Sequence, residues 1–169
     1  MKILRLDSVG GISGDMMLGV LIGLGADRGK LEKVLQTIVP EEAFSLVCEK
    51  VCLNGLTGVR ASVKIPRESH CHRALKDIEI LLDRSQLPEA AKVDSLAVFR
   101  LLAEAEGAVH GMAPEEVMFH EVGALDSIVD IAGCCMAWHE LGLEKLALSC
   151  PDAPKALIPC SMQDGDLSC

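Results

Sequence analysis

Aromatic residues are scarce in this sequence of 169 residues, which has one Trp, three Phe and no Tyr. Proteins that bind single-stranded nucleic acid stack bases on aromatic side chains, so this composition argues against such a protein. The chain also lacks any run of Lys and Arg, and its formal net charge is −9. A charge of this sign repels a nucleic-acid backbone. A nucleotide or a metal cation is still an allowed ligand, because each is bound through local contacts.

Long apolar runs are absent as well. No stretch approaches the roughly 18–20 uninterrupted apolar residues that a membrane helix needs. Arg5 and Asp7 interrupt the apolar start of the chain, which therefore does not resemble a signal peptide. We expect a cytoplasmic protein with no membrane partner. The eight cysteines contain no C-x-x-C pair, and in a reducing compartment we expect most of them to be small buried side chains.

Half of the residues are apolar, which is enough for the core of one domain. We place this domain at residues 1–148. Residues 149–169 have no apolar periodicity and contain Pro151, Pro154 and Pro159. The sequence therefore predicts a poorly packed tail at 149–169.

Helix caps and turn residues divide the domain into elements. Asp27 is a good helix N-cap, Asn54-Gly55 is a hairpin turn signal, and Gly111 and Gly142 end helices. The expected strands lie at 3–6, 44–53, 59–65, 117–122 and 146–148, and the expected helices lie near 14–25, 27–40, 75–82, 88–109 and 126–141.

This order of elements predicts the α/β class, as a two-layer mixed α/β sandwich with a β-hairpin and several packed helices. The helix at 88–109 is apolar around much of its circumference, so we expect it to be central. The order of the strands does not follow from the sequence.

A polar segment at residues 67–73 contains the first candidate site, His70-Cys71-His72. Imidazole and thiolate groups suit nickel, copper and zinc better than magnesium. In a loop the three side chains can converge on one metal ion, and in a strand His70 and His72 would share a face. The alternative is a solvated loop with two ordinary histidines.

A second candidate site lies at residues 119–131. Asp126 and Asp130 are one helical turn apart and share a face, although helix capping alone would account for Asp126. Asp130 lies within an apolar helix, where a carboxylate without a partner is costly. His120 can be that partner, or both can face a cation or a phosphate-bound metal ion. His120-Glu121 does not match the zinc-protease motif, because no second histidine follows at the required spacing.

The third candidate site is the glycine-rich turn at residues 10–15. Backbone N–H groups at such a turn can bind phosphate at the start of a helix. The segment matches neither the P-loop nor the dinucleotide-binding motif. Helix capping alone would also account for Ser13 and Asp15.

Four separated segments resemble the LarC-type nickel-insertion family over residues 1–148, and they occur in the family's order. They are ISGDM at 12–16, LKDIE at 75–79, AEAEGAVHG at 103–111 and FHEVGALDSIVDI at 119–131. The resemblance implies insertion of nickel into pyridinium-3,5-bisthiocarboxylic acid mononucleotide, which forms one carbon–nickel and two sulfur–nickel bonds. The resemblance also implies that the full-length family uses CTP with magnesium or manganese, matures the cofactor of lactate racemase and acts as a nickel chelatase of the lyase class.

The same resemblance implies three sets of site residues. The metal set, which is implied to acquire nickel, is His70, Cys71 and His72. These residues match a family loop that often has a longer run of histidines. The catalytic set is His120, Glu121, Asp126 and Asp130. The cofactor-binding set is Ser13, Gly14 and Asp15.

Family members continue into a C-terminal half that is associated with CTP use, and the resemblance fades near Ser149. The resemblance therefore implies that residues 149–169 are a truncated or frame-shifted tail. We therefore expect this chain to supply nickel delivery and part of the pocket, with the C-terminal half as its partner. Whether it is an enzyme by itself, and whether it forms a homo-oligomer, stay open. Two alternatives are a non-catalytic nickel chaperone or storage module and a divalent-metal-dependent nucleotide-binding enzyme.

Overall fold

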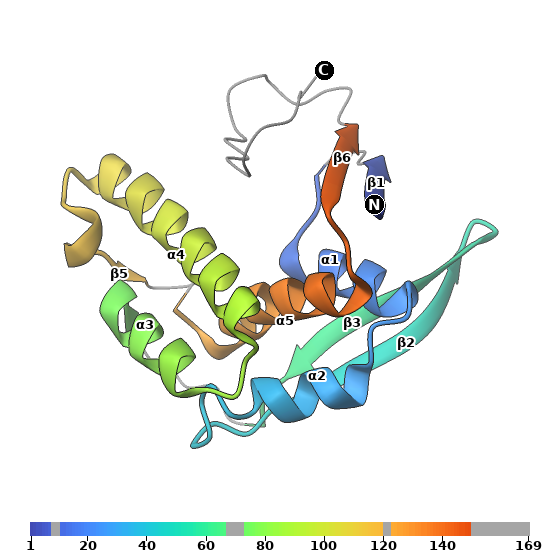
Figure 1. The fold of residues 1–169 in the computed structure, drawn as a ribbon, viewed down its shortest axis with the longest axis horizontal. Coiled ribbons are helices and arrows are strands. Elements are labelled where there is room, and N and C mark those ends of the chain that lie inside the picture. The colour runs from blue at the N-terminus through green and yellow to red at the C-terminus, as the bar shows by residue number, and fades with distance from the viewer. Residues whose placement is uncertain (8–10, 67–72, 120–122, 150–169) are drawn as a thin grey trace.

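The structure, a computed structural model, describes residues 1–7, 11–66, 73–119 and 123–149 (Figure 1). Its helices are α1 (Gly14–Gly23), α2 (Arg28–Leu35), α3 (Leu75–Arg84), α4 (Glu89–His110), the 3-10 turn η1 (Pro114–Glu116) and α5 (Leu125–Leu141). Its strands are β1 (Ile3–Asp7), β2 (Ser45–Leu53), β3 (Leu56–Lys64), β4 (Arg73–Ala74), β5 (Met118–Phe119) and β6 (Lys145–Ser149). The mixed α/β class predicted from the sequence is confirmed. The described strands form three two-stranded sheets, β1–β6, β2–β3 and β4–β5.

The first and last described strands lie side by side. β1 and β6 run parallel, from the pair Ile3 and Lys145 to the pair Asp7 and Ser149. In Figure 1 they stand above α1 and α5, and the chain passes through every other element between them. Because β1 leads towards α1 and α5 leads into β6, this pairing keeps α1 and α5 together.

The predicted hairpin is confirmed, with a tighter turn than expected. β2 and β3 are antiparallel and Leu53 pairs with Leu56, so Asn54 and Gly55 alone form the loop. Asn54 has φ 50° and Gly55 has φ 81°. Positive φ at both positions is the geometry that matches strand twist in a two-residue hairpin, and Asn-Gly tolerates it best. β3 therefore begins before the predicted residue 59.

Two glycines let α1 approach its neighbours closely. A Cβ atom on Gly19 would lie 2.5 Å from the carbonyl oxygen of Val59 in β3. On the other side of α1, a Cβ atom on Gly133 of α5 would lie 3.2 Å from a methyl carbon of Leu18. α1 is thus packed between the hairpin and α5 (Figure 1).

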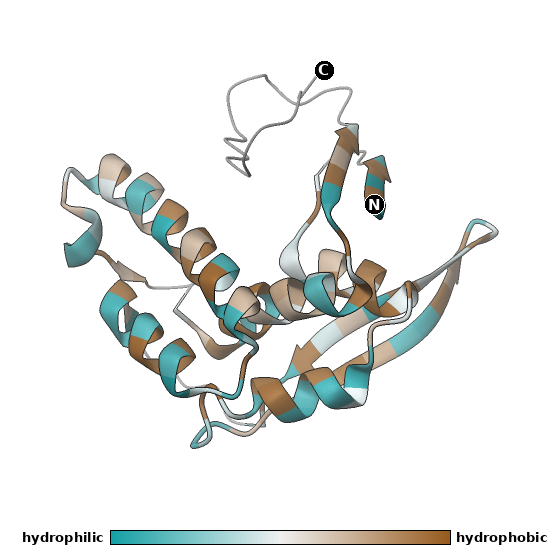
Figure 2. Cartoon of the chain, viewed as in Figure 1, coloured by the Kyte–Doolittle hydropathy of each residue, from teal (hydrophilic) through white to brown (hydrophobic). Residues whose placement is uncertain are grey.

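The central helix is α5, and the expectation that α4 is central was wrong. α5 contacts α1, α2 and α4. α4 buries Phe99 and Ala103, but Val93 is 59% exposed and Val109 is 81% exposed. Figure 2 shows hydrophobic and hydrophilic residues alternating along α4. Alanine and valine residues make α4 apolar around much of its circumference. Such residues are common on protein surfaces, so this pattern did not require the helix to be buried on every side.

α2 begins as predicted and ends early. The Asp27 carboxylate accepts hydrogen bonds from the backbone N–H groups of Gly29 (2.8 Å) and Lys30 (3.1 Å), which confirms the cap. The helix was predicted to continue to Pro40 but ends at Leu35. The Thr37 hydroxyl donates to the carbonyl of Val34 at 2.6 Å, a local bond that competes with the helical pattern.

Among the helices that the structure describes, none has the length and apolar character needed to cross a membrane.

Candidate functional site

Two of the candidate segments meet where α1 begins. Gly14 lies against Asp130, because a Cβ atom on Gly14 would lie 2.9 Å from the Asp130 Cβ and 3.1 Å from its Oδ2. The parallel β1–β6 pair and the packing of α1 on α5 bring these two residues together. The cofactor-binding candidates Ser13, Gly14 and Asp15 and the catalytic candidate Asp130 therefore share one site.

Asp130 is the group in this site whose ionisation is most altered. Burial, with smaller effects from the Asp15 and Asp126 carboxylates, raises the pKa of Asp130 to about 7. Its Oδ1 is buried and has no hydrogen-bond partner among the described residues. A buried carboxylate without a donor is costly, so the protonated form is favoured. At neutral pH this carboxyl group is therefore able both to accept and to release a proton.

The neighbouring acids have local hydrogen bonds. Asp15 accepts from the Ser13 hydroxyl and from the Met16 backbone N–H at 2.8 Å. Ser13 is the N-cap residue of α1 as predicted, but its side chain does not cap the helix, because its hydroxyl donates to Asp15 instead.

Asp126 lies in the first turn of α5 and is exposed. It accepts from the Ser127 backbone N–H at 2.8 Å. It is not the N-cap residue, which is Ala124. A negative charge in the first turn of a helix is stabilised by the helix dipole, so this position by itself gives Asp126 a structural role.

A thiol that sequence reasoning missed completes this site. Cys134 follows Asp130 by one turn of α5, and its Sγ donates to the Gly14 carbonyl at 3.5 Å. Burial, with the charges of Cys135, Asp130 and Asp15, raises the pKa of the Cys134 thiol far above its ordinary value. Burial also raises the pKa of Cys135 to about 11. Both groups are therefore neutral thiols at pH 7. The sequence could have indicated this neighbour, because residues four positions apart in a helix lie on the same face.

The remaining candidates lie outside the described residues: they are His70, Cys71, His72, His120 and Glu121. The residues that flank them are described. Arg73 follows the first segment, and Phe119 and Gly123 flank the second. Arg73 and Phe119 pair across the β4–β5 ladder, so the two segments join the fold at neighbouring points.

The described aspartates do not form a cation site by themselves. Within residues 1–7, 11–66, 73–119 and 123–149, no group of three or more His, Cys, Asp or Glu side chains is arranged to hold a metal ion. A divalent cation such as magnesium usually takes several oxygen ligands. Asp15, Asp126 and Asp130 therefore do not fit such an ion without further ligands, and we assign them no step that uses one.

The structure thus defines a mixed α/β protein with a partly buried carboxyl group on α5 that packs against the first turn of α1. The sequence model of the family described as nickel insertion protein matches residues 4–167. The chain belongs to this family, as its resemblance predicted. No solved structure is significantly similar to it.

Several relatives are named pyridinium-3,5-bisthiocarboxylic acid mononucleotide nickel insertion protein. The one from Staphylococcus epidermidis is 41% identical over 148 residues, which are 88% of this chain and 37% of the relative. The one from Akkermansia muciniphila is 42% identical over 151 residues, 85% of this chain and 37% of the relative. The one from Desulfitobacterium hafniense is 42% identical over 149 residues, which are 88% of this chain and 37% of the relative. The chain therefore spans 37% of the length of these relatives.

Proposed function

We propose that this chain captures nickel and forms part of the pocket in which nickel is inserted into pyridinium-3,5-bisthiocarboxylic acid mononucleotide. The observation that supports the proposal most is the contact between Gly14 and Asp130. It joins the ISGDM and FHEVGALDSIVDI segments, which lie far apart in the sequence, around a carboxyl group with a pKa of about 7.

Nickel is a substrate in this proposal. His70, Cys71 and His72 supply imidazole and thiolate donors, which suit nickel and are the proposed acquiring residues. His120 and Glu121 are proposed to receive the ion in the pocket. The described cysteines of α5 are not among the proposed nickel ligands, because burial raises the pKa of the Cys134 and Cys135 thiols.

Asp130 is proposed to accept the proton that carbon–nickel bond formation releases. In that step the ring carbon–hydrogen bond breaks, its electron pair forms the bond to nickel, and the proton moves to the Asp130 carboxylate. A base works best when its pKa is near the working pH. A pKa of about 7 meets that condition at neutral pH, whereas the ordinary pKa of an aspartate does not.

The acidic site suits the pyridinium ring better than the phosphate of the nucleotide. The negative charges of Asp15 and Asp126 both contribute to the raised pKa of Asp130. The same charges attract a pyridinium cation and repel a phosphate. We therefore propose that Ser13, Gly14 and Asp15 contact the ring end of the substrate, and that the phosphate lies elsewhere.

The rest of the reaction is proposed to need the C-terminal region of the longer relatives. In this view that region brings CTP with magnesium or manganese, and the product serves lactate racemase in the cytoplasm. Residues 1–148 are then proposed to form the domain, with residues 149–169 as its tail. The length comparison supports this division of labour, because the relatives are much longer than the aligned part.

The proposal is tested in two steps. A nickel titration compares the wild type with His70→Ala/His72→Ala, and His110→Ala/His139→Ala is the matched control with two other histidines replaced. Loss of affinity is expected for the first variant alone; equal affinity in all three removes segment 67–72 from the mechanism.

The chain is then mixed with the C-terminal region of the Staphylococcus epidermidis relative, the nucleotide, nickel, CTP and magnesium. Metallated nucleotide, measured by mass spectrometry, is expected. Nickel binding without product would favour a chaperone. Magnesium-dependent nucleotide binding that survives His70→Ala/His72→Ala, without nickel binding, would favour a nucleotide-binding enzyme.

A further inference from the structure

The β1–β6 pair is an unusually small parallel sheet. Parallel sheets normally have both faces covered by helices, and two strands alone are only marginally stable. Among the residues that the structure describes, this sheet has just two strands, and the main contact of each strand is with the other. Figure 1 shows the pair above α1 and α5 and away from α2 and α3. The pair therefore has the form of one part of a larger sheet.

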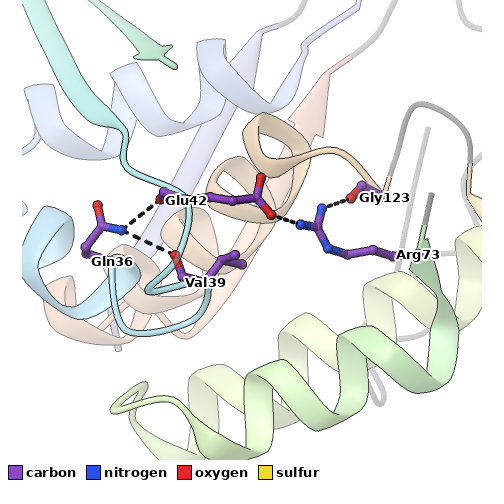
Figure 3. Close-up of polar contacts among 5 residues, drawn as sticks. All are labelled: Gln36, Val39, Glu42, Arg73 and Gly123. Atoms are coloured by element: carbon purple, nitrogen blue, oxygen red, sulfur yellow. Dashed lines mark hydrogen bonds and ion pairs between the residues drawn. The ribbon is translucent and has the colours of Figure 1, made fainter. Parts of the chain in front are cut away.

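The other short sheet, β4–β5, is bound into the fold by a buried charge. Arg73 of β4 is 7% exposed, and its guanidinium group donates to Oε1 of Glu42 and to the carbonyl oxygen of Gly123 (Figure 3). In β1, by contrast, Nη2 of Arg5 lies 3.1 Å from Oδ1 of Asp7, and both side chains are exposed. The charges of β1 thus pair locally at the surface and do not connect the strand to distant parts of the chain.

The end of the β1–β6 pair where both strands begin is nevertheless fixed. The Lys2 backbone N–H donates to Oε1 of Glu144 at 3.0 Å, and the Lys2 ammonium group donates to the carbonyl oxygen of Leu141 at 2.7 Å. The Lys2 carbonyl accepts from the Glu144 backbone N–H at 2.9 Å. Leu141 is the last residue of α5, so the pair is held at the end of the central helix. The two strands are thus a fixed surface to which a further strand can be added.

One face of the pair is apolar and only partly covered. Side chains at paired positions of neighbouring strands point to the same face, and they alternate along each strand. Leucines stand at two such pairs, Leu4 with Leu146 and Leu6 with Leu148. The four leucines therefore share one face, and Figure 2 shows hydrophobic residues on both strands. Leu4 is 7% exposed and Leu146 is 37% exposed, so this face is less covered on β6 than on β1.

The backbone of β6 has a free edge. The Lys145 N–H donates to the Lys2 carbonyl at 3.4 Å, so the backbone groups of Lys145 point towards β1. Successive residues of a strand in a parallel pair direct these groups to opposite sides. Leu146 and Leu148 therefore direct theirs away from β1, to a side on which no described strand lies. Such outward N–H and C=O groups, here called the β6 edge, are a template for pairing with another strand.

We infer that the β6 edge binds a strand from the C-terminal region of the longer relatives, which completes the sheet. The inference rests on the proposed function, which makes that region the partner of this chain. The matched part is 37% of the Staphylococcus epidermidis relative, so the larger part of that protein can supply the strand. β6 is also the last described element, and consecutive strands are neighbours roughly two-thirds of the time. The added strand extends the leucine face, so its apolar residues are expected at alternate positions.

Hydrogen exchange at single amides tests the edge directly. The full chain is measured by NMR alone and in a mixture with the C-terminal region of the Staphylococcus epidermidis relative. The Leu146 and Leu148 amides are expected to exchange at least about tenfold more slowly in the mixture, because they gain acceptors. Ile3 and Arg5 are the control: the Lys2 carbonyl points towards β6, so alternation directs their amides to the opposite edge. Their exchange is expected to stay within about twofold.

A substitution at the edge provides a second test. Leu148→Pro removes one outward N–H and leaves the bonds to β1 in place, since proline is tolerated where the N–H faces away from the sheet. Arg5→Pro is the matched control, because it removes an outward N–H from β1. Affinity for the C-terminal region, by calorimetric titration, is expected to fall about tenfold or more in Leu148→Pro alone. Leu148→Ala keeps the N–H and is expected to lose less. Full affinity in a folded Leu148→Pro overturns the inference.

The outcomes separate this inference from the proposed function. A complex whose Leu146 and Leu148 amides exchange as fast as in the free chain overturns docking at the β6 edge alone. No complex overturns both this docking and the proposed partnership. A protected β6 edge in a chain that binds no nickel overturns the proposed capture of nickel and leaves the docking in place.

Slow exchange of the Leu146 and Leu148 amides in the chain by itself also overturns the inference. Protection that is independent of protein concentration then assigns the edge to residues 150–169, and protection that grows with concentration assigns it to a second copy of the chain. Circular dichroism checks that the proline variants fold, and if one does not, the exchange of the wild type decides. If the separate C-terminal region does not fold, a hybrid with residues 1–149 in place of the matched part of the relative is measured in its place.

Discussion

Gly14 of α1 packs directly against the side chain of Asp130 of α5, so that a Cβ atom at position 14 would lie 2.9 Å from the Asp130 Cβ. Any side chain on residue 14 would force the two helices apart or turn the carboxyl group. The same contact shields Asp130 from solvent on one side and places the Asp15 carboxylate near it. The packing of one glycine is therefore coupled to the ionisation of one acid.

The first prediction concerns that packing. Gly14→Ala is expected to destabilise the fold by about 1–3 kcal/mol, because the added methyl group overlaps the Asp130 side chain. Urea unfolding followed by circular dichroism measures the change. Gly58→Ala is the control, since a Cβ atom there has nothing within 4 Å. Equal stabilities of the two variants would contradict the close contact.

The second prediction concerns pH and stability. The folded pKa of Asp130, about 7, lies above its ordinary value of 3.8. Between these values the unfolded chain has released this proton and the folded chain has kept it, so deprotonation favours unfolding. The stability that is present below pH 4 is therefore lost as the pH rises through 7.

Asp130→Asn removes this titration and keeps the shape of the side chain. Relative to the wild type, it is expected to gain stability between pH 4 and pH 8, on the order of 1–2 kcal/mol after allowance for solvent screening. Urea unfolding of both proteins across that range gives the difference. A difference that does not change with pH would show that Asp130 has an ordinary pKa.

The third prediction concerns the cysteines of α5. Cys134 and Cys135 are largely neutral thiols at pH 8 because burial raises the pKa of each, whereas Cys52 is exposed on β2. Only thiolates react readily with iodoacetamide. In the native protein Cys52 is expected to be alkylated at least about tenfold faster than either α5 cysteine. Site-resolved mass spectrometry measures these rates, and urea is expected to equalise them. Rapid native labelling of Cys134 would contradict its burial.

The features that were predicted well depend on neighbouring residues in the sequence. Asp27 caps α2 through N–H groups two and three residues away. Gly111 and Gly142 end α4 and α5 in the left-handed conformation that glycine adopts most easily. Asn54-Gly55 makes the tight turn of the hairpin. In each case the physical cause lies within a few residues, so the sequence pattern contains it.

The features that were missed depend on contacts between distant segments. Asp130 was recognised as a carboxylate in an apolar helix, but its contact with Gly14 requires the packing of α1 on α5. The same packing places Cys134 beside the Gly14 carbonyl. Arg73 looked like one more polar residue of segment 67–73, because its partner Glu42 and its acceptor Gly123 lie far away in the sequence. Periodicity and capping rules consider only residues that are close in the sequence, so they cannot predict these contacts.

The last prediction concerns the proposed chemical step. If Asp130 accepts the proton from the ring carbon, Asp130→Asn lowers the rate of cofactor formation by about 100-fold or more, the contribution typical of a general base. The rate is measured with the chain mixed with the C-terminal region of the Staphylococcus epidermidis relative. Nickel affinity is expected to stay unchanged, because the proposed acquiring residues are elsewhere. Asp83→Asn, an exposed change on α3, is the control and is expected to keep the wild-type rate.

The pH profile separates this chemical role from a structural one. The wild-type rate is expected to rise with pH through about 7, as the carboxylate form of Asp130 accumulates. The residual rate of Asp130→Asn lacks this rise, because an amide does not titrate. A distorted pocket would lower the rate at every pH and leave the rise in place. An Asp130→Asn variant that keeps the wild-type profile would therefore assign the proton to another base, and His120 would be the first to replace.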